Sequence, residues 1–346
     1  MASAGAGLHV GVIGVGRIGA LHARTLSSLD DVAAVSVTDT DLDRAEQLAQ
    51  ALEVRSAPSA EALVDDGVDA LVIATPTPSH ASLIRLAGSA RVPTFCEKPV
   101  ALDLATLDAV VDEATRAGSF VQVGFQRRFD SGYRAAHDAV ATGALGTVLV
   151  LRAATHDPAP PAEEYIATSG GIFRDLHIHD FDAVRFVTGR EIVEVYADGA
   201  VRETEWFDEH GDVDTAVAVL RLDDGALAIL SGTRRDPLGY DVRLEVFGTQ
   251  DSIVVGVDDR SPLHSVEPGT RRDGTPGYRN FIERFEPAYR AELEAFVGAV
   301  QSGGTSPCPL HEARSALVVA LAADRSRAER RPVATEEVTS AEAPAR

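Results

Sequence analysis

One lysine stands apart from every other cation in the chain. Among 346 residues there are 32 basic side chains, of which 31 are arginine, and the exception is Lys98 in the run Phe95-Cys96-Glu97-Lys98-Pro99. Arginine stays charged at any accessible pH, whereas lysine is a compact donor whose pKa shifts readily when water is removed. Such a group suits a site that moves protons, so we expect Lys98 to be catalytic rather than a surface lysine left by drift.

A second set of residues capable of chemistry follows the pair Gly170-Gly171. If this segment is helical, Asp175 and His179 lie one turn apart on the same face, and Asp182 lies a further turn along it. A histidine held by a carboxylate is a plausible general base. We therefore expect Asp175 and His179 to act together.

The other polar residues of this segment are weaker candidates. His177 would point to the side nearly opposite His179, and we expect His177 and Asp180 to face solvent or to line the edge of the site. The spacing His-x-His-Asp also resembles a metal-ligand cluster, but residues i and i+2 of a helix cannot bind one ion together. We therefore expect no metal site.

A glycine-rich motif predicts a dinucleotide cofactor. The run Gly14-Val15-Gly16-Arg17-Ile18-Gly19 matches G-x-G-x-x-G between a predicted strand and a predicted helix, the context that makes this motif specific. Its glycines make the tight turn, let the backbone approach a pyrophosphate, and let helix and strand pack closely. Asp39 follows Gly19 by 20 residues, where a carboxylate binds the ribose hydroxyls and repels a 2′-phosphate. Thr40 and Asp41, not an arginine, come next, so we expect NAD.

Short apolar runs alternate with helical patterns over the first 124 residues, which predicts β-α-β units around a parallel sheet. The predicted strands are 8–13, 32–38, 70–74, 94–96 and 120–124, and the predicted helices are 18–29, 42–52, 79–90 (capped by Ser79) and 103–117. The ligand crevice of such a sheet lies at the carboxyl ends of its strands. We therefore expect the residues near these ends to bind the cofactor, namely Thr75, Pro76, His80, Glu97, Lys98 and Gln126.

The pattern changes to a period of two after Gly124, which predicts an open, mostly antiparallel sheet with helices. The predicted strands are 147–155, 192–201, 213–222, 226–233 and 241–248, with a hairpin turn at 223–225, and the helices are 131–142, 175–188, 286–300 and 311–328. The expected fold is a Rossmann-type, doubly wound α/β domain followed by an α+β domain. We place the dinucleotide-binding domain at 1–124, a substrate-binding and oligomerisation domain at 125–331, and a flexible tail at 332–346.

The bulk composition excludes several classes of partner. The formal net charge is −21 with the acidic residues scattered, which argues against nucleic acid and anionic membranes. No apolar run approaches the roughly 18–20 residues of a membrane span, and residues 1–7 look like a loose leader rather than a signal peptide. Cys96 and Cys308 are too few for a disulfide framework. We expect a cytoplasmic protein.

The glycine motif, Glu97-Lys98-Pro99 and Asp175-x-x-x-His179 together resemble the oxidoreductase family named for glucose-fructose oxidoreductase, inositol dehydrogenase and the rhizopine protein MocA. The resemblance covers about residues 8–330. It implies that Lys98, Asp175 and His179 form the catalytic set and that a small polyol is the substrate. It also implies that the uncovered face of the second sheet joins copies of the chain into a homotetramer.

Within this family the inositol dehydrogenases are the most similar, through residues 121–133, His156 and Gly239-Tyr240-Asp241. In those enzymes the residues that match Arg127, His156 and Tyr240 help to bind the polyol. Gln126 stands where some relatives have methionine. The segments 157–166 and 200–212 differ from those of the relatives and could line the rim of the substrate pocket. The identity of the polyol therefore stays open.

The reaction that this resemblance implies is NAD-dependent oxidation of a ring alcohol of a cyclitol to a ketone, with myo-inositol as the expected substrate. His179 would take the hydroxyl proton, Lys98 would stabilise negative charge on the reacting oxygen, and Asp175 would orient His179 and bind a neighbouring hydroxyl. Two alternatives stay open, a dehydrogenase of another cyclitol or sugar and a non-catalytic NAD-binding sensor.

Overall fold

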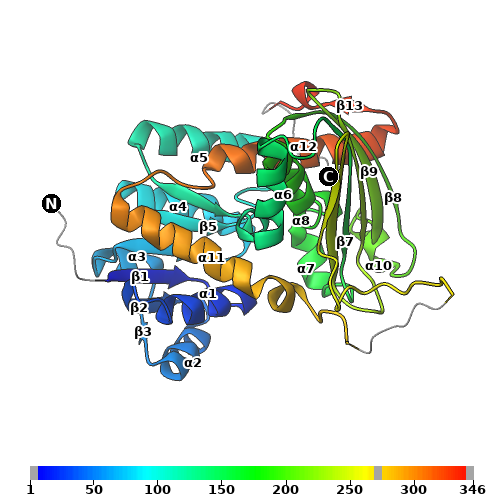
Figure 1. Ribbon diagram of the computed structural model, residues 1–346. Helices are drawn as coiled ribbons and strands as arrows, with labels where there is room; N and C mark the ends of the chain where they lie inside the picture. Colours follow the sequence, from blue (N-terminus) through cyan, green and yellow to red (C-terminus); the bar gives the residue numbers. More distant parts are fainter. Residues whose placement is uncertain (1–6, 269–274, 340–346) are drawn as a thin grey trace. The chain divides into compact units, whose positions relative to one another are not determined.

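Two compact units make up the chain, which the computed structural model describes at residues 7–268 and 275–339 (Figure 1). The first unit contains the chain up to Gln126 and Tyr289–Arg314, and the second contains Arg127–Ala288 and the chain from Ser315 onward. A single boundary after residue 124 is therefore too simple. Two long helices, α11 (Phe281–Ser302) and α12 (Leu310–Glu329), each begin in one unit and end in the other.

The first unit is built on a six-stranded parallel sheet in the order β3-β2-β1-β4-β5-β6. Its strands are β1 (Leu8–Ile13), β2 (Val32–Thr38), β3 (Arg55–Ser56), β4 (Ala70–Ile73), β5 (Thr94–Glu97) and β6 (Val121–Gly124). Every residue of β4, β5 and β6 is buried, as cover by helices on both faces requires. The strand order reverses at β1, and open α/β sheets bind their ligands at such a reversal.

The helices of the first unit close its core. They are α1 (Arg17–Ser27), α2 (Leu42–Leu52), α3 (Ala60–Asp65), α4 (His80–Ser89) and α5 (Leu104–Ala117). One buried cluster joins β1, β2, β4 and β5 to α1, α2 and the part of α11 that carries Leu293, Phe296 and Val297. This cluster holds together the four strands whose carboxyl ends carry most of the predicted cofactor residues.

Short polar side chains start most of these helices. Asp41, Ser59 and Asp103 accept backbone N–H groups at the starts of α2, α3 and α5. Ser79 occupies the cap position of α4, as predicted, but its side chain makes no capping hydrogen bond, and a 3-10 turn, η1 (Thr77–Ser79), precedes that helix. The Ser79 hydroxyl instead donates to the Pro76 carbonyl and lies 2.6 Å from the Thr75 hydroxyl, which ties the turn after β4 together.

The second unit is built on a seven-stranded sheet in the order β12-β11-β7-β10-β9-β8-β13. Its strands are β7 (Val148–His156), β8 (Ile192–Ala200), β9 (Thr215–Leu222), β10 (Leu227–Thr233), β11 (Asp241–Gly248), β12 (Ser252–Val255) and β13 (Val333–Ala334). All neighbouring strands are antiparallel except β7 and β10. The predicted combination of a Rossmann-type domain with a mostly antiparallel α+β domain is thereby confirmed.

The helices of this unit differ from prediction at one functional position. They are α6 (Ser131–Ala141), α7 (Glu163–Ser169), α8 (Ile172–Asp175), α9 (Ile178–Thr188) and α10 (Trp206–Glu209), together with the later part of α12 and the 3-10 helices η2 (Gln126–Phe129, which begins at the unit boundary) and η3 (Thr335–Glu337). A single helix over 175–188 is wrong, because the chain breaks between α8 and α9. There the N–H of His177 bonds to the Ile172 carbonyl five residues back, and Asp180 holds the His177 ring.

The described part of the predicted tail is ordered. Val333 pairs with Val195 of β8, and the carboxylate of Glu337 accepts hydrogen bonds from Arg331. A sheet edge offers backbone partners that the polar composition of this segment did not reveal. Residues 340–346, and residues 1–6 of the predicted leader, lie outside the described residues.

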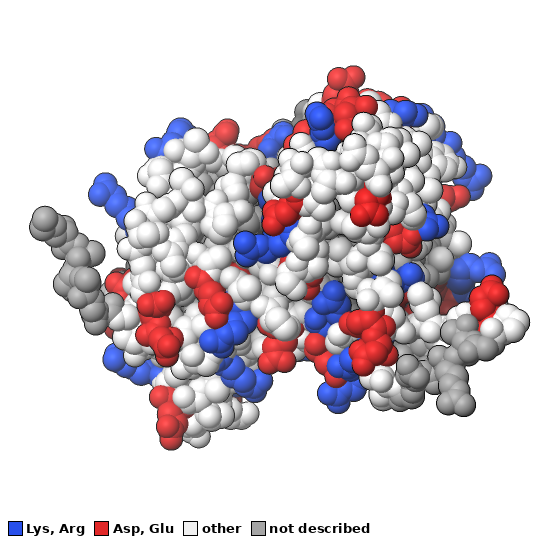
Figure 2. All heavy atoms as spheres, viewed as in Figure 1, with Lys and Arg blue, Asp and Glu red and all other residues white. Residues whose placement is uncertain are grey.

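Charge is intermixed on the surface. Figure 2 shows acidic and basic side chains interspersed on the face in view, with no large area of one sign. Within residues 7–268 and 275–339, no helix has both the length and the apolarity that crossing a bilayer demands.

Candidate active site

Strand pairing in the first unit brings the predicted cofactor residues to one edge of the sheet. Ile13 lies opposite Ile73, Ile73 lies opposite Cys96, and Glu97 lies opposite Gly124. The turns that follow β1, β4, β5 and β6 therefore leave the sheet at the same end. They carry, in that order, the glycine motif, Thr75 and Pro76, Lys98, and Gln126.

The glycine motif has the geometry that a bound pyrophosphate needs. Gly14 has a φ of 86°, and a Cβ there would lie 2.8 Å from the Thr75 nitrogen. A Cβ on Gly19 would lie 1.8 Å from the Gly14 carbonyl oxygen, so only glycine allows α1 to pack this close to β1. A Cβ on Gly16 would meet nothing within 4 Å, which leaves open space at the start of α1, where Arg17 and Ile18 form the first turn.

Asp39 holds the neighbouring loop and remains suited to a ribose. One carboxylate oxygen accepts the Val15 N–H at 2.8 Å, and the other accepts the Asp41 N–H at 2.9 Å. A carboxylate has about four lone-pair sites, so further acceptor capacity remains for sugar hydroxyls. Arg44, from the first turn of α2, lies 3.5 Å from Asp39, a neighbour that the sequence argument overlooked because it is not adjacent in the chain.

His80 links two of these turns. Its Nε2 lies 2.7 Å from the Thr75 carbonyl oxygen and its Nδ1 lies 2.9 Å from the Pro99 carbonyl oxygen. Burial lowers the pKa of His80, which favours the neutral ring, while both carbonyls and Glu97 oppose that shift. His80 thus supports the turn that contains Lys98, which is itself half-buried, and a contact of His80 with the cofactor stays a prediction.

In the second unit, three successive residues at the end of β7 organise the polar groups. The Thr155 hydroxyl is hydrogen-bonded to both Arg127 and Asp180. The His156 ring lies near Asp241, and Asp157 accepts a hydrogen bond from Arg234. The strand end opposite them supplies Arg234 just after β10, because Thr233 pairs with His156. The end of β7 is therefore the centre of the candidate substrate site in this unit.

Arg127 and Asp180 form a buried ion pair. Arg127 donates to Asp180 at 2.5 Å and to the Thr155 hydroxyl at 3.0 Å, and Asp180 also accepts hydrogen bonds from Thr155 at 2.8 Å and from the His177 ring at 2.8 Å. Burial alone would raise the pKa of Asp180, but Arg127 and His177 lower it to about 2. The guanidinium of Arg127 is thus directed into the protein, which suits support of the site more than direct contact with a polyol.

Of the two expectations for His177 and Asp180, exposure to solvent is wrong, and a place at the edge of the site stays a prediction. His177 is fully buried and Asp180 is 1% exposed, because Arg127 balances the carboxylate and a paired charge can be buried. The His177 ring fills space that Gly232 leaves free, since a Cβ on that glycine would lie 2.4 Å from Nε2. Both side chains therefore lie in the interior of the second unit, not on the outer surface of α9.

Asp175 is held by residues that the sequence did not single out. Its two oxygens accept hydrogen bonds from the Tyr165 hydroxyl at 2.7 Å and from Arg234 at 2.8 Å, and Arg234 also bonds to Asp157 at 3.1 Å. Asp175 raises the pKa of Tyr165. Because α8 ends at Asp175, this residue and the half-buried His179 are not on one continuous helix, and orientation of His179 by Asp175 stays a prediction.

His156 is the last residue of β7, and Tyr240 directly precedes the neighbouring strand β11. The His156 Nδ1 is 3.7 Å from Asp241 and 4.0 Å from Asp236, and its Nε2 is 3.3 Å from the Ser231 hydroxyl. Burial lowers the pKa of His156, while both carboxylates oppose that change. Tyr240 is buried, and its burial raises its pKa. Both side chains can therefore act as neutral hydrogen-bond partners.

Some functional neighbours were missed by sequence reasoning. Tyr165 falls in the segment 157–166, which was singled out only as a pocket rim. Asp157 falls in the same segment, whereas Arg234 gave no signal, because arginine is abundant in this chain and only the pairing of β7 with β10 brings Arg234 to Asp157. Lys98 belongs to the first unit. The second unit contains Arg127, His156, Asp175, His179 and Tyr240.

A parallel sheet with this glycine turn and an acidic residue after its second strand defines a dinucleotide-binding protein. Residues 8–125 match the oxidoreductase family with an NAD-binding Rossmann fold, and residues 133–254 match the GFO/IDH/MocA C-terminal domain. The chain belongs to the Gfo/Idh/MocA family of NAD-binding oxidoreductases. The family and the cofactor predicted from the motifs are confirmed.

Its similar proteins include named inositol dehydrogenases. A myo-inositol 2-dehydrogenase of Thermotoga maritima is 39% identical over 96% of this chain and 99% of its own length. A myo-inositol dehydrogenase of Streptomyces leeuwenhoekii is 41% identical over 92% of this chain and 96% of its own. A crystal structure of scyllo-inositol dehydrogenase from Lactobacillus casei with NAD(H) and scyllo-inositol has a TM-score of 0.86 and 28% identity, covering 95% of this chain and 99% of that one.

Proposed function

We propose that this protein is an NAD-dependent dehydrogenase that oxidises one ring alcohol of a cyclitol to a ketone, with myo-inositol as the preferred substrate. The observation that carries this proposal is the nearly full-length similarity to a named myo-inositol 2-dehydrogenase, in a chain that has Lys98, Asp175 and His179. Family membership alone would not establish catalysis, whereas a non-catalytic sensor would have no need of these three residues.

The chain's own residues supply the acid–base and electrostatic parts of the reaction. Oxidation removes a hydride from the ring carbon and a proton from its hydroxyl, and NAD, when bound, supplies the hydride acceptor. His179 takes the hydroxyl proton, and Lys98 donates a hydrogen bond to the same oxygen, where negative charge develops. Asp175 binds a neighbouring hydroxyl and orients His179, held in place by Tyr165 and Arg234.

Cofactor binding follows from the first unit. The backbone at Gly14, Gly16 and Gly19 would hold the pyrophosphate and Asp39 the ribose hydroxyls. Thr75, Pro76, Glu97 and Gln126 would support the remaining part of the dinucleotide from the same edge of the sheet.

Polyol recognition falls to the second unit in this proposal. A ring with several hydroxyls needs closely spaced donors and acceptors, and the end of β7 offers His156, with Tyr240 just before β11 and Asp175 from α8. Arg127 acts by fixing Asp180 and Thr155 beneath these groups. Scyllo-inositol is the second candidate substrate, because the Lactobacillus casei protein of similar structure was crystallised with it.

A substrate panel tests the proposal. NADH formation would be measured with myo-inositol, scyllo-inositol, chiro-inositol, glucose and galactose, with NAD and NADP in parallel and with the His179→Ala variant as the inactive control. Myo-inositol with NAD should give the highest kcat/KM. Turnover of a different polyol would keep the mechanism and change the substrate, and NAD binding without turnover of any polyol would favour the sensor.

We propose in addition that a second copy of the chain covers the outer face of the second sheet, giving a homo-oligomer that is a tetramer by family resemblance. Tyr196, Val219 and Ile229 lie opposite one another on β8, β9 and β10 and are 41%, 42% and 46% exposed. Arg152 and Glu245 extend this row on β7 and β11 as an ion pair. A monomer rarely leaves so apolar a face open.

The oligomer has its own test. Val219→Glu with Ile229→Glu should lower the molar mass measured by light scattering to that of one chain, and an unchanged molar mass would refute this face as the contact. We also propose that the protein works in the cytoplasm, because two cysteines in 346 residues are too few for the disulfide framework of a secreted protein.

A further inference from the structure

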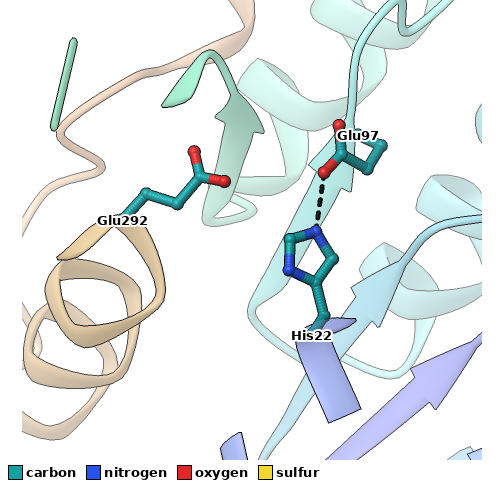
Figure 3. A group of neighbouring side chains, drawn as sticks. All are labelled: His22, Glu97 and Glu292. Carbon is teal, nitrogen blue, oxygen red and sulfur yellow. Dashed lines mark hydrogen bonds and ion pairs between the residues drawn. The ribbon is translucent and has the colours of Figure 1, made fainter. Parts of the chain in front are cut away.

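A buried cluster of three ionisable residues lies in the first unit beside the strand that carries Lys98. His22 comes from α1, Glu97 is the last residue of β5, and Glu292 comes from α11, and all three are at most 8% exposed. The His22 ring nitrogen and the carboxylate oxygens that face it lie within 4.8 Å of one another. Figure 3 shows the Glu292 carboxyl group directed toward the His22–Glu97 pair.

The side chain of Glu97 is held on two sides. One oxygen is hydrogen-bonded to the His22 Nε2 at 2.6 Å, and the other faces Gly124 so closely that a Cβ there would lie 3.0 Å from it. The His22 ring is fixed in turn by edge contacts with Phe95 and Tyr289, at centroid distances of 5.4 and 5.9 Å. Because Lys98 is the next residue after Glu97, the position of this carboxylate bears directly on the catalytic turn.

The Glu292 carboxyl group differs from that of Glu97 in its hydrogen bonding. Neither of its carboxylate oxygens has a hydrogen-bond partner within residues 7–268 and 275–339, and the side chain is fully buried. The titratable groups that face it are Glu97 from β5 and His22 from α1, while β6 presents the uncharged Gln122, which donates to the Glu292 backbone carbonyl. Burial, and then the charge of Glu97, raise the pKa of Glu292 well above its ordinary value.

A resident metal ion is a poorer explanation of this cluster. The His22–Glu97 contact of 2.6 Å is a hydrogen bond between the two atoms that would have to bind the ion. A protonated Glu292 removes the need for a cation, because the cluster then holds one carboxylate paired with a histidine and one neutral acid.

We propose that His22 and Glu292 are positioning residues for Lys98, with His22 fixing the Glu97 carboxylate by a hydrogen bond and Glu292 kept as a neutral carboxylic acid that spares Glu97 a second negative charge. The importance of Lys98 rests on the proposed dehydrogenase function. The protonation of Glu292 does not, and it can be tested without any activity.

The Glu292→Gln variant tests the neutral acid. In wild-type protein Glu292 keeps its proton in the folded state and loses it in the unfolded state once the pH exceeds about 4.5, its ordinary pKa. The stability of the folded protein therefore falls as pH rises from that value up to the raised pKa of the folded state. Glutamine has the same shape and no such dependence. The Tm of Glu292→Gln should therefore exceed that of wild type by a margin that grows between pH 5 and pH 8, since each unit is about a tenfold change in the folding constant.

The matched control is Glu294→Gln, which changes an exposed residue of the same helix and should show a Tm difference independent of pH. Infrared spectroscopy gives a second readout, because the carbonyl band of a protonated carboxyl group at neutral pH should disappear in Glu292→Gln. A Tm difference of opposite sign that grows with pH would mean that Glu292 is ionised. Stoichiometric zinc or manganese in the purified protein, lost in Glu292→Gln, would identify a metal site. Either result overturns the proposal.

The His22→Phe variant tests positioning. Phenylalanine keeps the ring contacts with Phe95 and Tyr289 and removes the hydrogen bond to Glu97. Protein made with lysine labelled at the ε-carbon gives one lysine NMR signal, because Lys98 is the only lysine, and the titration of that signal should shift in His22→Phe. With myo-inositol, kcat should fall about tenfold, the factor of one pKa unit, with little change in the KM for NAD.

His22→Gln, which can still donate to Glu97, should restore most of kcat, and Arg24→Ala, an exposed change on the same helix, should behave as wild type. A folded His22→Phe variant with wild-type kcat and an unchanged lysine titration would overturn the positioning role. If wild type oxidises no polyol, the proposed function fails. The Tm measurements would still show whether Glu292 is protonated, and the NMR measurements would still show whether His22 affects Lys98.

Discussion

Replacing Asp180 by asparagine removes the charge that makes a buried arginine tolerable in the second unit. The Asp180 carboxylate accepts hydrogen bonds from Arg127, Thr155 and His177, and the Arg127 side chain is 2% exposed. The amide group introduced by Asp180→Asn keeps the shape of the carboxylate but cannot balance the guanidinium. The variant therefore measures how much the ion pair beneath the proposed substrate site contributes to the fold.

The free energy of unfolding lost in Asp180→Asn can be estimated in two ways. Lowering the Asp180 pKa from 3.8 to about 2 corresponds to about 2 kcal/mol in favour of the ionised form in the folded protein. Leaving Arg127 buried without its partner costs more, about 3–5 kcal/mol. For a unit of roughly 150–250 residues, about 2–4 °C is lost per kcal/mol, so the Tm of Asp180→Asn should fall by about 6–20 °C.

Thermal unfolding followed by circular dichroism would measure this loss, with Asp138→Asn, a change at a side chain that is 77% exposed on α6, as the matched control. Because the folded pKa of Asp180 is depressed, its contribution is complete above the unfolded value near 4 and is lost as pH falls toward 2. The difference between wild type and Asp180→Asn should therefore shrink in acid. Equal Tm values for the two asparagine variants at pH 7 would refute the ion-pair argument.

Three further substitutions test the chemistry. Lys98→Arg should lower kcat by about 10²–10³-fold, because the larger planar guanidinium cannot replace the compact ammonium donor at the reacting oxygen. The Kd for NAD, measured by fluorescence, should stay near that of wild type, and near-normal turnover would remove the special role of the lysine. His179→Ala should lower kcat by about 10²–10⁴-fold at every pH in steady-state assays, and an effect confined to KM would exclude it as the base. Asp39→Ala should raise the ratio of kcat/KM for NADP to kcat/KM for NAD by about 10–100-fold, because it removes a charge-assisted hydrogen bond to the ribose. It also frees Arg44, which lies 3.5 Å from Asp39, to bind the 2′-phosphate. An unchanged ratio would refute the assignment of Asp39.

Local sequence patterns predicted the parts of this molecule that depend on near neighbours. Gly14 and Gly19 are five positions apart and pack within one β-α turn, so the motif could be interpreted from the sequence alone. The strands of both sheets follow from apolar runs and alternation for the same reason. The family and cofactor that these patterns implied are confirmed by similarity over most of the chain.

Long-range pairs could not be predicted in the same way. Asp180 looked like a surface residue because its partner, Arg127, lies 53 positions earlier, and a chain with 31 arginines offers no means of choosing among them. The break between α8 and α9 arises from the same buried pairing of His177 with Asp180. Glu292 resembled any other helix glutamate until α11 placed it against His22 and Glu97.

Transfer of deuterium from substrate to cofactor would show directly whether this protein removes a hydride from carbon 2 of myo-inositol. Myo-inositol deuterated at carbon 2 would be incubated with NAD and the protein, and the NADH would be analysed by mass spectrometry. We expect NADH that carries one deuterium to be formed by wild type and not by His179→Ala. Absence of NADH formation, or NADH without deuterium, would contradict hydride transfer from that ring carbon.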